Sequence, residues 1–251
     1  MKIIIRILLI LAGIIATVLA CLYLYFRLLD RQEQSEGPPP YPIGLGSYET
    51  VGSTTIDPTT LLEDIHSGRQ LALQAQADIP HNPPFLIQVG WSQNDYMEIA
   101  KAYQKAIWQD DPTLWHLYKL EFHTTCNNTN RKFGYADFLY YQEVTNGGEK
   151  LYSVREIEID PQHGYLAWGG DTFYPPEMPD VWTAINLENI AKVPAEKALA
   201  LADQQQGNEF RKKENDICNI TVFMWPYQPK GNDWSVLYSG KTYAEIWIPT
   251  K

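Results

Sequence analysis

Residues 133–169 read FGYADFLYYQEVTNGGEKLYSVREIEIDPQHGYLAWG, and this stretch decides the fold. Its centre, Asn146-Gly147-Gly148, predicts a tight hairpin because both glycines accept the positive φ that such turns require. The alternation of Ile157 and Ile159 with charged neighbours is typical of a strand that is buried on one face. Pro161 and Gly164, which follow Asp160, predict a further turn. Together these signals predict an antiparallel meander.

A helix and one more strand are expected before this meander. Ser92 and Asp95 have the spacing of a helix capping box. Apolar side chains then recur at the spacing of an amphipathic helix, at Tyr96, Ala100, Tyr103 and Ile107. Residues 113–123 alternate as a strand, which would place four side chains on one face: Leu114, Tyr118, Leu120 and Phe122. Residues 92–170 are therefore expected to form one helix-on-sheet unit.

The same order of elements repeats towards the C-terminus. Residues 194–206 are typical of a helix with Gly207 as its C-terminal cap, and three strand patterns follow within residues 217–248. Residues 171–193 form a proline-rich connection, and residues 194–251 a second unit. The predicted fold class is α+β, with an N-terminal transmembrane helix followed by two tandem helix-on-antiparallel-sheet units.

Three short motifs resemble the PepSY family of small extracytoplasmic modules, over about residues 92–251. They are the strand and turn from Ile157 to Gly164, the alanine- and leucine-rich helix at residues 195–202, and the strand Trp234-Ser235-Val236-Leu237-Tyr238. The second unit lacks the family's aspartate-to-glycine turn, and residues 41–90 have no counterpart. The resemblance implies a non-catalytic module with a role in peptidase regulation or envelope sensing. It supplies no catalytic residues.

An N-terminal apolar segment is expected to anchor the chain in a membrane. Residues 7–26 are 20 consecutive positions without a charge, and as a helix they would span roughly 30 Å, the thickness of a hydrocarbon core. We expect a short tail at residues 1–6 and an uncleaved anchor at residues 7–29, because the run is too long and too bulky at its end for a cleavable signal peptide. Cys21 follows a lipobox-like Val18-Leu19-Ala20, although apolar residues continue beyond it.

The remainder of the chain is acidic and is expected outside the cell membrane. Up to residue 31 the chain carries four basic residues and one acidic residue, so residues 32–251 hold 16 basic and 29 acidic residues. A body of this charge is not expected to bind nucleic acid. Residues 30–60, with three consecutive prolines, are typical of a spacer, and residues 61–91 of a helical and irregular lead-in. We predict a single-pass protein that contacts membrane lipid through its anchor and has an extracytoplasmic body.

Two cysteines lie outside the anchor, Cys126 and Cys218, one in each predicted unit. An oxidising compartment would permit a disulfide between them, while the apolar alternation around Cys218 also suits a buried free thiol, and the sequence leaves both open. His116 and His123 are seven residues apart on a predicted strand, so they should face opposite sides and form no metal site with Cys126. We expect no metal and no cofactor.

No motif of a known catalytic mechanism is present in the sequence. It contains no nucleophile elbow, no phosphate-binding glycine loop and no zinc-protease helix. Asp110-Asp111 is expected to form a helix-end turn, and Glu156 with Glu158 the solvated face of a strand. Aromatic side chains around the proline-rich connection are the candidate docking surface for a protein or a glycan: Trp168, Phe173, Tyr174 and Trp182.

These features predict a non-catalytic binding, accessory or regulatory protein. Two alternatives stay open: an envelope hydrolase, possibly directed at glycans, and a small subunit of a membrane complex that packs through Gly13, Ala16 and Ala20. A hydrolase should show a deep pocket in which carboxylates, or a histidine and a carboxylate, converge. A binding module should instead present an exposed aromatic patch without convergent ionisable groups.

Overall fold

The computed structural model describes residues 50–71, 73, 90–109, 111–128, 132–170, 172–174, 187, 192–225 and 233–250. The first half contains β1 (Thr50–Thr55), α2 (Leu61–His66), α3 (Gln93–Trp108), η1 (Pro112–Leu114), β2 (His116–Thr125), β3 (Tyr135–Asn146), β4 (Glu149–Asp160), β5 (Tyr165–Gly169) and β6 (Thr172–Tyr174). The second half contains α5 (Ala195–Ala202), the π-helical turn η3 (Asp203–Gly207), α6 (Asn208–Lys213), β7 (Asn219–Met224), β8 (Trp234–Ser239) and β9 (Tyr243–Ile248).

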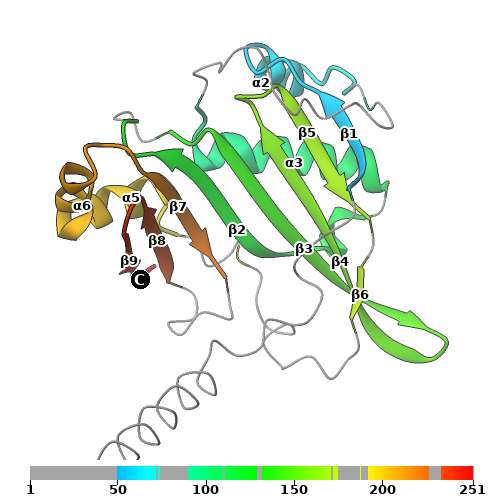
Figure 1. The fold of residues 1–251 in the computed structure, drawn as a ribbon. Coiled ribbons are helices and arrows are strands. Elements are labelled where there is room, and N and C mark those ends of the chain that lie inside the picture. Colours follow the sequence, from blue (N-terminus) through cyan, green and yellow to red (C-terminus); the bar gives the residue numbers. More distant parts are fainter. Residues whose placement is uncertain are drawn as a thin grey trace, which may run out of the picture. The chain divides into compact units, whose positions relative to one another are not determined.

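The nine strands of the described residues form one antiparallel sheet in the order β1-β5-β4-β3-β2-β7-β8-β9, with β6 paired to β4 (Figure 1). The prediction of two tandem helix-on-sheet units is therefore wrong. The finding that overturns it is the pairing of β2 with β7, in which residues 120–125 face residues 219–224. Alone, each meander would leave its first strand, β2 or β7, as an open edge with unpaired backbone N–H and C=O groups. Pairing β2 with β7 provides hydrogen-bond partners for these groups on both strands.

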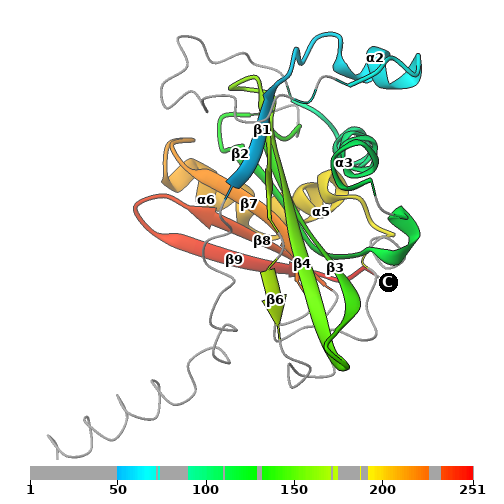
Figure 2. The same ribbon diagram turned by 90° about the vertical axis from the view of Figure 1, so that its right-hand side faces the viewer.

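Helices cover one face of this sheet. Figure 1 shows α3 behind the strands of the first half, and Figure 2 shows α3 and α5 on the same side of the strands. Between the helices and the sheet lies one core that runs through both halves. Phe122 of β2 contacts Phe138 of β3 and Trp234 of β8, and all three side chains are fully buried. The shared core is a second reason why the two halves do not separate.

The local signals predicted the start of α3 and the central hairpin correctly. Ser92 Oγ accepts a hydrogen bond from the Asp95 backbone N–H at 3.2 Å, and Asp95 Oδ2 accepts one from the Ser92 N–H at 2.8 Å. Between β3 and β4, Gly147 and Gly148 have φ values of 61° and 89°, as the hairpin sequence requires. These two features confirm the capping box and the turn.

The predicted end of the C-terminal helix is wrong. Gly207 does not cap this helix: with φ −60° and ψ −40° it lies inside a helical run that continues from α5 through η3 into α6. The role of Gly207 at this position is steric, because a Cβ there would overlap the hydroxyl and ring of Tyr238. The glycine therefore permits a close helix–strand contact, which local sequence patterns do not reveal.

A β-bulge in β2 changes which side chains face the core. The register between β2 and β3 shifts between Leu117 and Lys119, which makes Tyr118 an extra residue. Leu117 therefore belongs to the core, while Tyr118 contacts the ring of Tyr141 away from it. Leu114 precedes the strand and is 56% exposed. The predicted stripe of Leu114, Tyr118, Leu120 and Phe122 is thus correct only for its last two members.

The same bulge brings the two strand histidines to one face. His116 pairs in register with Tyr141 and His123 with Tyr135, and each ring contacts its partner. Tyr135 and Tyr141 are six residues apart on β3 and point to the same side. The expectation that the histidines face opposite sides is therefore wrong, because the inserted residue restores an even spacing.

The predicted anchor at residues 7–29 and Trp182 lie outside the described residues. Of the helices in the described part, none combines the length and apolar character that crossing a bilayer requires.

Candidate functional site

The sheet face opposite the helices carries a group of ionisable and phenolic side chains. Alternate residues of each strand point to this outer face. We name the group the outer cluster, and its members are Lys119, Glu121 and His123 of β2, Tyr135 and Asp137 of β3, Glu156 and Glu158 of β4, and Tyr165 of β5. Glu121, Asp137 and Glu158 lie side by side across three strands. Like charges in such a row destabilise a sheet unless other groups compensate them.

The ammonium group of Lys119 offsets the charge repulsion between two of these carboxylates, Glu121 and Asp137. Its Nζ lies 2.6 Å from Glu121 Oε2 and 2.9 Å from Asp137 Oδ2, and its side chain is only 16% exposed. Burial alone would lower the pKa of Lys119, but the charges of Asp137 and Glu121 raise it above its ordinary value. Lys119 therefore stays charged at neutral pH and fixes an ammonium group between two carboxylates.

His123 stabilises the other oxygen of Glu121. Its Nε2 lies 3.0 Å from Glu121 Oε1, and its Nδ1 lies 3.3 Å from Thr221 Oγ1 on β7. Burial would raise the pKa of Glu121, but the His123 hydrogen bond and the Lys119 charge lower it to about 2. Glu121 is thus a permanent anion, and His123 connects the outer cluster to the second half of the sheet.

Asp137 and Glu156 form the pair whose hydrogen bonding depends on a proton. The Asp137 side chain is 9% exposed; its Oδ2 binds Lys119 Nζ, and the carboxyl group is also hydrogen-bonded to Glu156. Glu156 lies diagonally across from Asp137 on β4, since Glu156 pairs with Leu139 and Asp137 with Glu158. Two carboxyl groups can share a hydrogen bond only when one of them holds a proton.

Glu156 is the member of this pair that holds the proton. Burial, the charge of Asp137 and the hydrogen bond to Asp137 raise the pKa of Glu156 to about 9, against the opposing effect of Lys119. At neutral pH Glu156 is therefore an uncharged hydrogen-bond donor beside Asp137. This is the most strongly perturbed arrangement on the outer face, and perturbed carboxyl groups of this kind are concentrated at functional sites.

Two tyrosine hydroxyl groups bind Glu158, the remaining carboxylate of the outer cluster. The Tyr165 hydroxyl donates a hydrogen bond to Glu158 Oε1, and Tyr135 makes a second hydrogen bond to the same carboxylate. Burial raises the pKa of Glu158, and the tyrosine hydrogen bonds offset part of this effect. Burial also raises the pKa of Tyr135 and Tyr165, so both hydroxyls remain donors at neutral pH.

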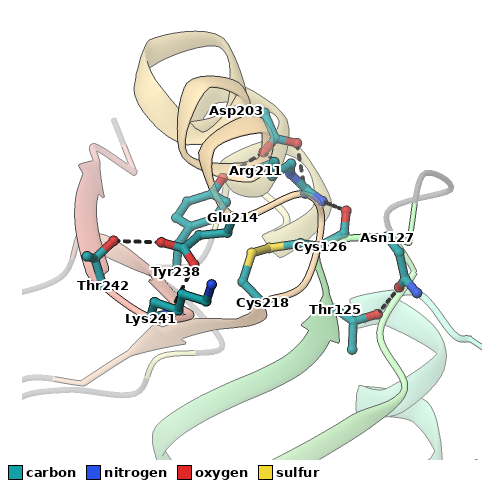
Figure 3. Close-up of a disulfide and its surroundings, with 10 residues drawn as sticks. All are labelled: Thr125, Cys126, Asn127, Asp203, Arg211, Glu214, Cys218, Tyr238, Lys241 and Thr242. Atoms are coloured by element: carbon teal, nitrogen blue, oxygen red, sulfur yellow. Dashed lines mark hydrogen bonds and ion pairs between the residues drawn. A yellow bond between two sulfur atoms is a disulfide. The ribbon is translucent and has the colours of Figure 1, made fainter.

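A disulfide joins Cys126 and Cys218, the two cysteines that the sequence left open (Figure 3). The residues lie opposite each other at the ends of β2 and β7, with Cα atoms 5.1 Å apart, and the Cys126 N–H donates to the Cys218 carbonyl at 2.8 Å. The bond therefore crosses the junction between the two halves of the sheet.

A buried ion pair supports the disulfide from the helix side. Arg211 binds Asp203 through Nε at 2.9 Å and Nη2 at 3.2 Å, and it also donates to the Cys126 carbonyl. The Tyr238 hydroxyl donates to Asp203 Oδ1 at 2.7 Å, as Figure 3 shows. Every charged group in this network has a partner inside the protein, so its arrangement serves to hold η3 and α6 against β2 and β8.

The predicted aromatic docking surface is not tested by the described residues and stays a prediction. Trp168 is partly buried, packs against the core and lies over Gly52. Phe173 and Tyr174 are described only as backbone in β6, which pairs with β4, and Trp182 lies outside the described residues. The structure therefore gives no arrangement for these four side chains as a group.

The outer cluster was missed because its members come from distant parts of the sequence. Glu156 and Glu158 were interpreted as a solvated strand face, which accounts for their alternation but not for their neighbours. A signal was available in the strand pairing: the hairpin at Gly147-Gly148 fixes the register that places Glu158 opposite Asp137. Among the described residues, no group of three or more metal-type ligands is present.

The comparisons with known proteins add no relative. No protein-family model matches the chain, and neither do any curated proteins or solved structures. The resemblance of residues 92–251 to the PepSY family therefore stays a prediction.

Proposed function

We propose that this chain is a membrane-anchored, extracytoplasmic protein of binding or accessory type, and that the outer cluster is its ligand-facing surface. The observation that carries the proposal is the Asp137–Glu156 pair, in which a buried Asp137 side chain lies beside a partly buried Glu156 whose pKa is raised by burial and by Asp137. Such a pair destabilises the folded state relative to neutral polar residues. Groups that reduce stability in this way are typical of sites retained for function.

Several features support an extracytoplasmic location. The 20 uncharged residues at positions 7–26 suit an anchor. The Cys126–Cys218 disulfide suits an oxidising compartment, since thiols are kept reduced in most cytosols. The PepSY resemblance implies the same location and a role in peptidase regulation or envelope sensing.

Openness of the outer cluster favours binding over catalysis. Side chains of Glu121 and His123 are 21% and 35% exposed, so water reaches the cluster. Hydrolases of the acid–base type usually place their carboxyl groups in a deep cleft that holds the substrate.

Site-specific photocrosslinking in intact cells tests the proposed surface. Phe223 on β7 pairs in register with Glu121, so a photoreactive phenylalanine analogue at this position would sit beside the outer cluster. The matched control carries the analogue at Lys105, an exposed position on α3. We expect adducts from position 223 that disappear in the Glu158→Gln background. Adducts from position 105 alone, or none from either, would contradict the proposal.

Protease treatment of sealed, right-side-out cells tests the location. We expect the body to be digested while intact cells retain the anchor, because the cleavage sites would lie outside the membrane. A body that is protected until the membrane is permeabilised would reverse the proposed orientation.

A hydrolase is the second candidate, and the Asp137–Glu156 pair is the observation that favours it. A protonated Glu156 could act as a general acid towards a glycan, with Asp137 as the accompanying carboxylate. Zymography on envelope glycan would detect this activity. Turnover that falls at least 100-fold in Glu156→Gln would favour the hydrolase, whereas absence of turnover in the unsubstituted protein would leave binding as the function.

A further inference from the structure

We propose that a hollow at one end of the sheet, beside the Cys126–Cys218 disulfide, binds a neutral oligosaccharide. We name it the terminal hollow, and its lining includes Thr125, Asn127, Asp216, Ile217, Asn219 and Ser239. Its volume is about 440 Å³, within the range of small-molecule sites in proteins. None of the described residues that line it belongs to the outer cluster, so its ligand is a second one, beyond the proposed function.

The strand register places a row of polar side chains along the terminal hollow. Thr125 of β2 pairs with Asn219 of β7, and Asn219 pairs with Ser239 of β8. Ser239 in turn pairs with Tyr243 of β9. Residues that pair directly in neighbouring strands point to the same face of the sheet. Because Tyr238, the neighbour of Ser239, lies in the core, this row lies on the face opposite the helices.

Several of these side chains offer hydrogen bonds that the fold does not use. Asp216, Asn219 and Ser239 are exposed, and their side chains have no hydrogen-bond partner among the described residues. The Thr125 hydroxyl donates to Asn127 Oδ1 at 2.5 Å, which leaves the amide NH₂ of Asn127 as a donor. A sugar hydroxyl both donates and accepts, so a site that combines amide, hydroxyl and carboxylate groups matches its chemistry.

Two exposed apolar side chains lie at the same end of the sheet. Tyr243 is 80% exposed and Ile217 is 79% exposed, the highest values among the large hydrophobic side chains of the described residues. Ile217 lines the terminal hollow, and Tyr243 pairs with Ser239, which also lines it. A sugar ring packs its C–H groups against such side chains while its hydroxyl groups form hydrogen bonds. Exposed apolar surface beside unused polar groups therefore favours a carbohydrate.

The rim of the terminal hollow is fixed by contacts within the protein. Asp216 has a φ of 58°, an uncommon value for a residue other than glycine, and its N–H donates to the Arg211 carbonyl at 2.9 Å. Across the hollow, the Glu214 carboxylate accepts from the Lys241 N–H at 3.0 Å and from the Thr242 hydroxyl at 2.8 Å, as Figure 3 shows. A rim that is already ordered loses little conformational entropy when a ligand binds.

A second hollow shares Asn127 and Asp216 with the first and has a volume of about 460 Å³. Its lining includes Asn128, Asn208 and Lys212. Two hollows that share lining residues suit a chain of several sugars better than a single one. Among the described residues that line the terminal hollow, Asp216 is negatively charged and none is a cation, which disfavours an acidic sugar.

Isothermal titration calorimetry of the full chain in mild detergent tests this proposal. The neutral probes are tri-N-acetylchitotriose, maltotriose and mannotriose, and the acidic probe is trigalacturonic acid. We expect at least one neutral trisaccharide to bind more tightly than its own monosaccharide, because the ligand extends over both hollows. Trigalacturonic acid should not bind.

Variants at the terminal hollow make the result specific. Tyr243→Ala and Asn219→Ala should each weaken binding of that trisaccharide about tenfold, while circular dichroism reports a folded chain. Tyr243→Phe keeps the ring and should bind as the unsubstituted chain does. Leu114→Ala is the matched control, because Leu114 is also apolar and 56% exposed but precedes β2, at the end of that strand away from Thr125. This variant should bind normally.

Other outcomes would overturn the proposal. Binding of trigalacturonic acid alone would make the ligand acidic. Sugar binding that Glu158→Gln abolishes and Tyr243→Ala leaves unchanged would belong to the outer cluster. If no trisaccharide binds while position 223 still gives adducts in cells, the terminal hollow is not a sugar site and the proposed function survives. If sugar binds as expected and position 223 gives no adducts, the proposed function alone fails.

Discussion

Glu156 carries its proton because of its neighbours, and this has a measurable effect on stability. In the unfolded chain its pKa is near the ordinary value of 4.5, whereas burial and Asp137 raise it to about 9 in the folded chain. The folded state therefore binds more protons between these pH values. This group's contribution is most favourable below pH 4.5, and it is lost as the pH rises towards 9.

We expect Glu156→Gln to remove most of this pH dependence and so to stabilise the protein at pH 8 relative to pH 5. The glutamine amide keeps a donor for Asp137 without a titrating proton, so the gain should shrink towards zero near pH 5. Urea denaturation at both pH values gives the comparison. An equal effect at pH 5 and pH 8 would mean that Glu156 holds no additional proton in the folded state.

Lys119 is the residue on which the outer cluster depends for stability. Replacing it by methionine leaves Asp137 and Glu121 without their shared cation, and we expect a loss of about 2 kcal/mol in the free energy of unfolding. Lys150→Met is the matched control, because the Lys150–Glu143 ion pair is 68% and 48% exposed and such pairs contribute little. Equal stability of the two variants would contradict a structural role for Lys119.

Among the elements, the helical run from α5 to α6 is held in place by a contact with β8. Gly207 leaves room for Tyr238, whose hydroxyl binds Asp203 at 2.7 Å. Gly207→Ala should force these groups apart and lower the free energy of unfolding by about 2–3 kcal/mol. Gln206→Ala, at an exposed position of the same turn, should change it little. Thermal unfolding of both variants tests the contact, and a stable Gly207→Ala variant would contradict it.

Local elements were predictable where their signal lies within a few residues. The capping box at Ser92 and the turn at Gly147-Gly148 depend only on backbone geometry near those residues, and both are present. The bulge at Tyr118 was not predictable, because an inserted residue is defined by its pairing with β3. The same limit applies to Gly207, whose role depends on a strand about 30 residues later in the chain.

The arrangement of the whole sheet was the main error, and its cause is the pairing of β2 with β7. Two similar patterns of helix and meander suggested two folded units. The unpaired backbone groups of two edge strands can, however, hydrogen-bond to each other however far apart the strands are in the sequence. The outer cluster was missed for the same reason. Its carboxyl groups become neighbours only through the register between β2, β3 and β4.

The disulfide should stabilise the sheet as a whole, because it connects its two halves. Cys126 and Cys218 are 92 residues apart in sequence, and closing a loop of that length contributes about 4–5 kcal/mol in the chain-entropy description. We expect the double variant Cys126→Ala/Cys218→Ala to lose stability of this order in urea, and Cys21→Ala to lose none. Non-reducing electrophoresis should show faster migration for the unsubstituted chain and for Cys21→Ala only.

If all three samples run alike with and without reductant, the two cysteines are not joined. The argument for an oxidising compartment would then lose its main support.

The central claim is that Glu156 keeps its proton at neutral pH beside the buried Asp137, on the sheet face opposite the helices. The most direct test is a ¹³C NMR titration of the glutamate side-chain carboxyl groups between pH 4 and pH 10, with the Glu156 resonance identified by its absence in Glu156→Gln. We expect that resonance to titrate with a midpoint near pH 9. A midpoint near pH 4.5, the ordinary value for glutamate, would contradict the claim.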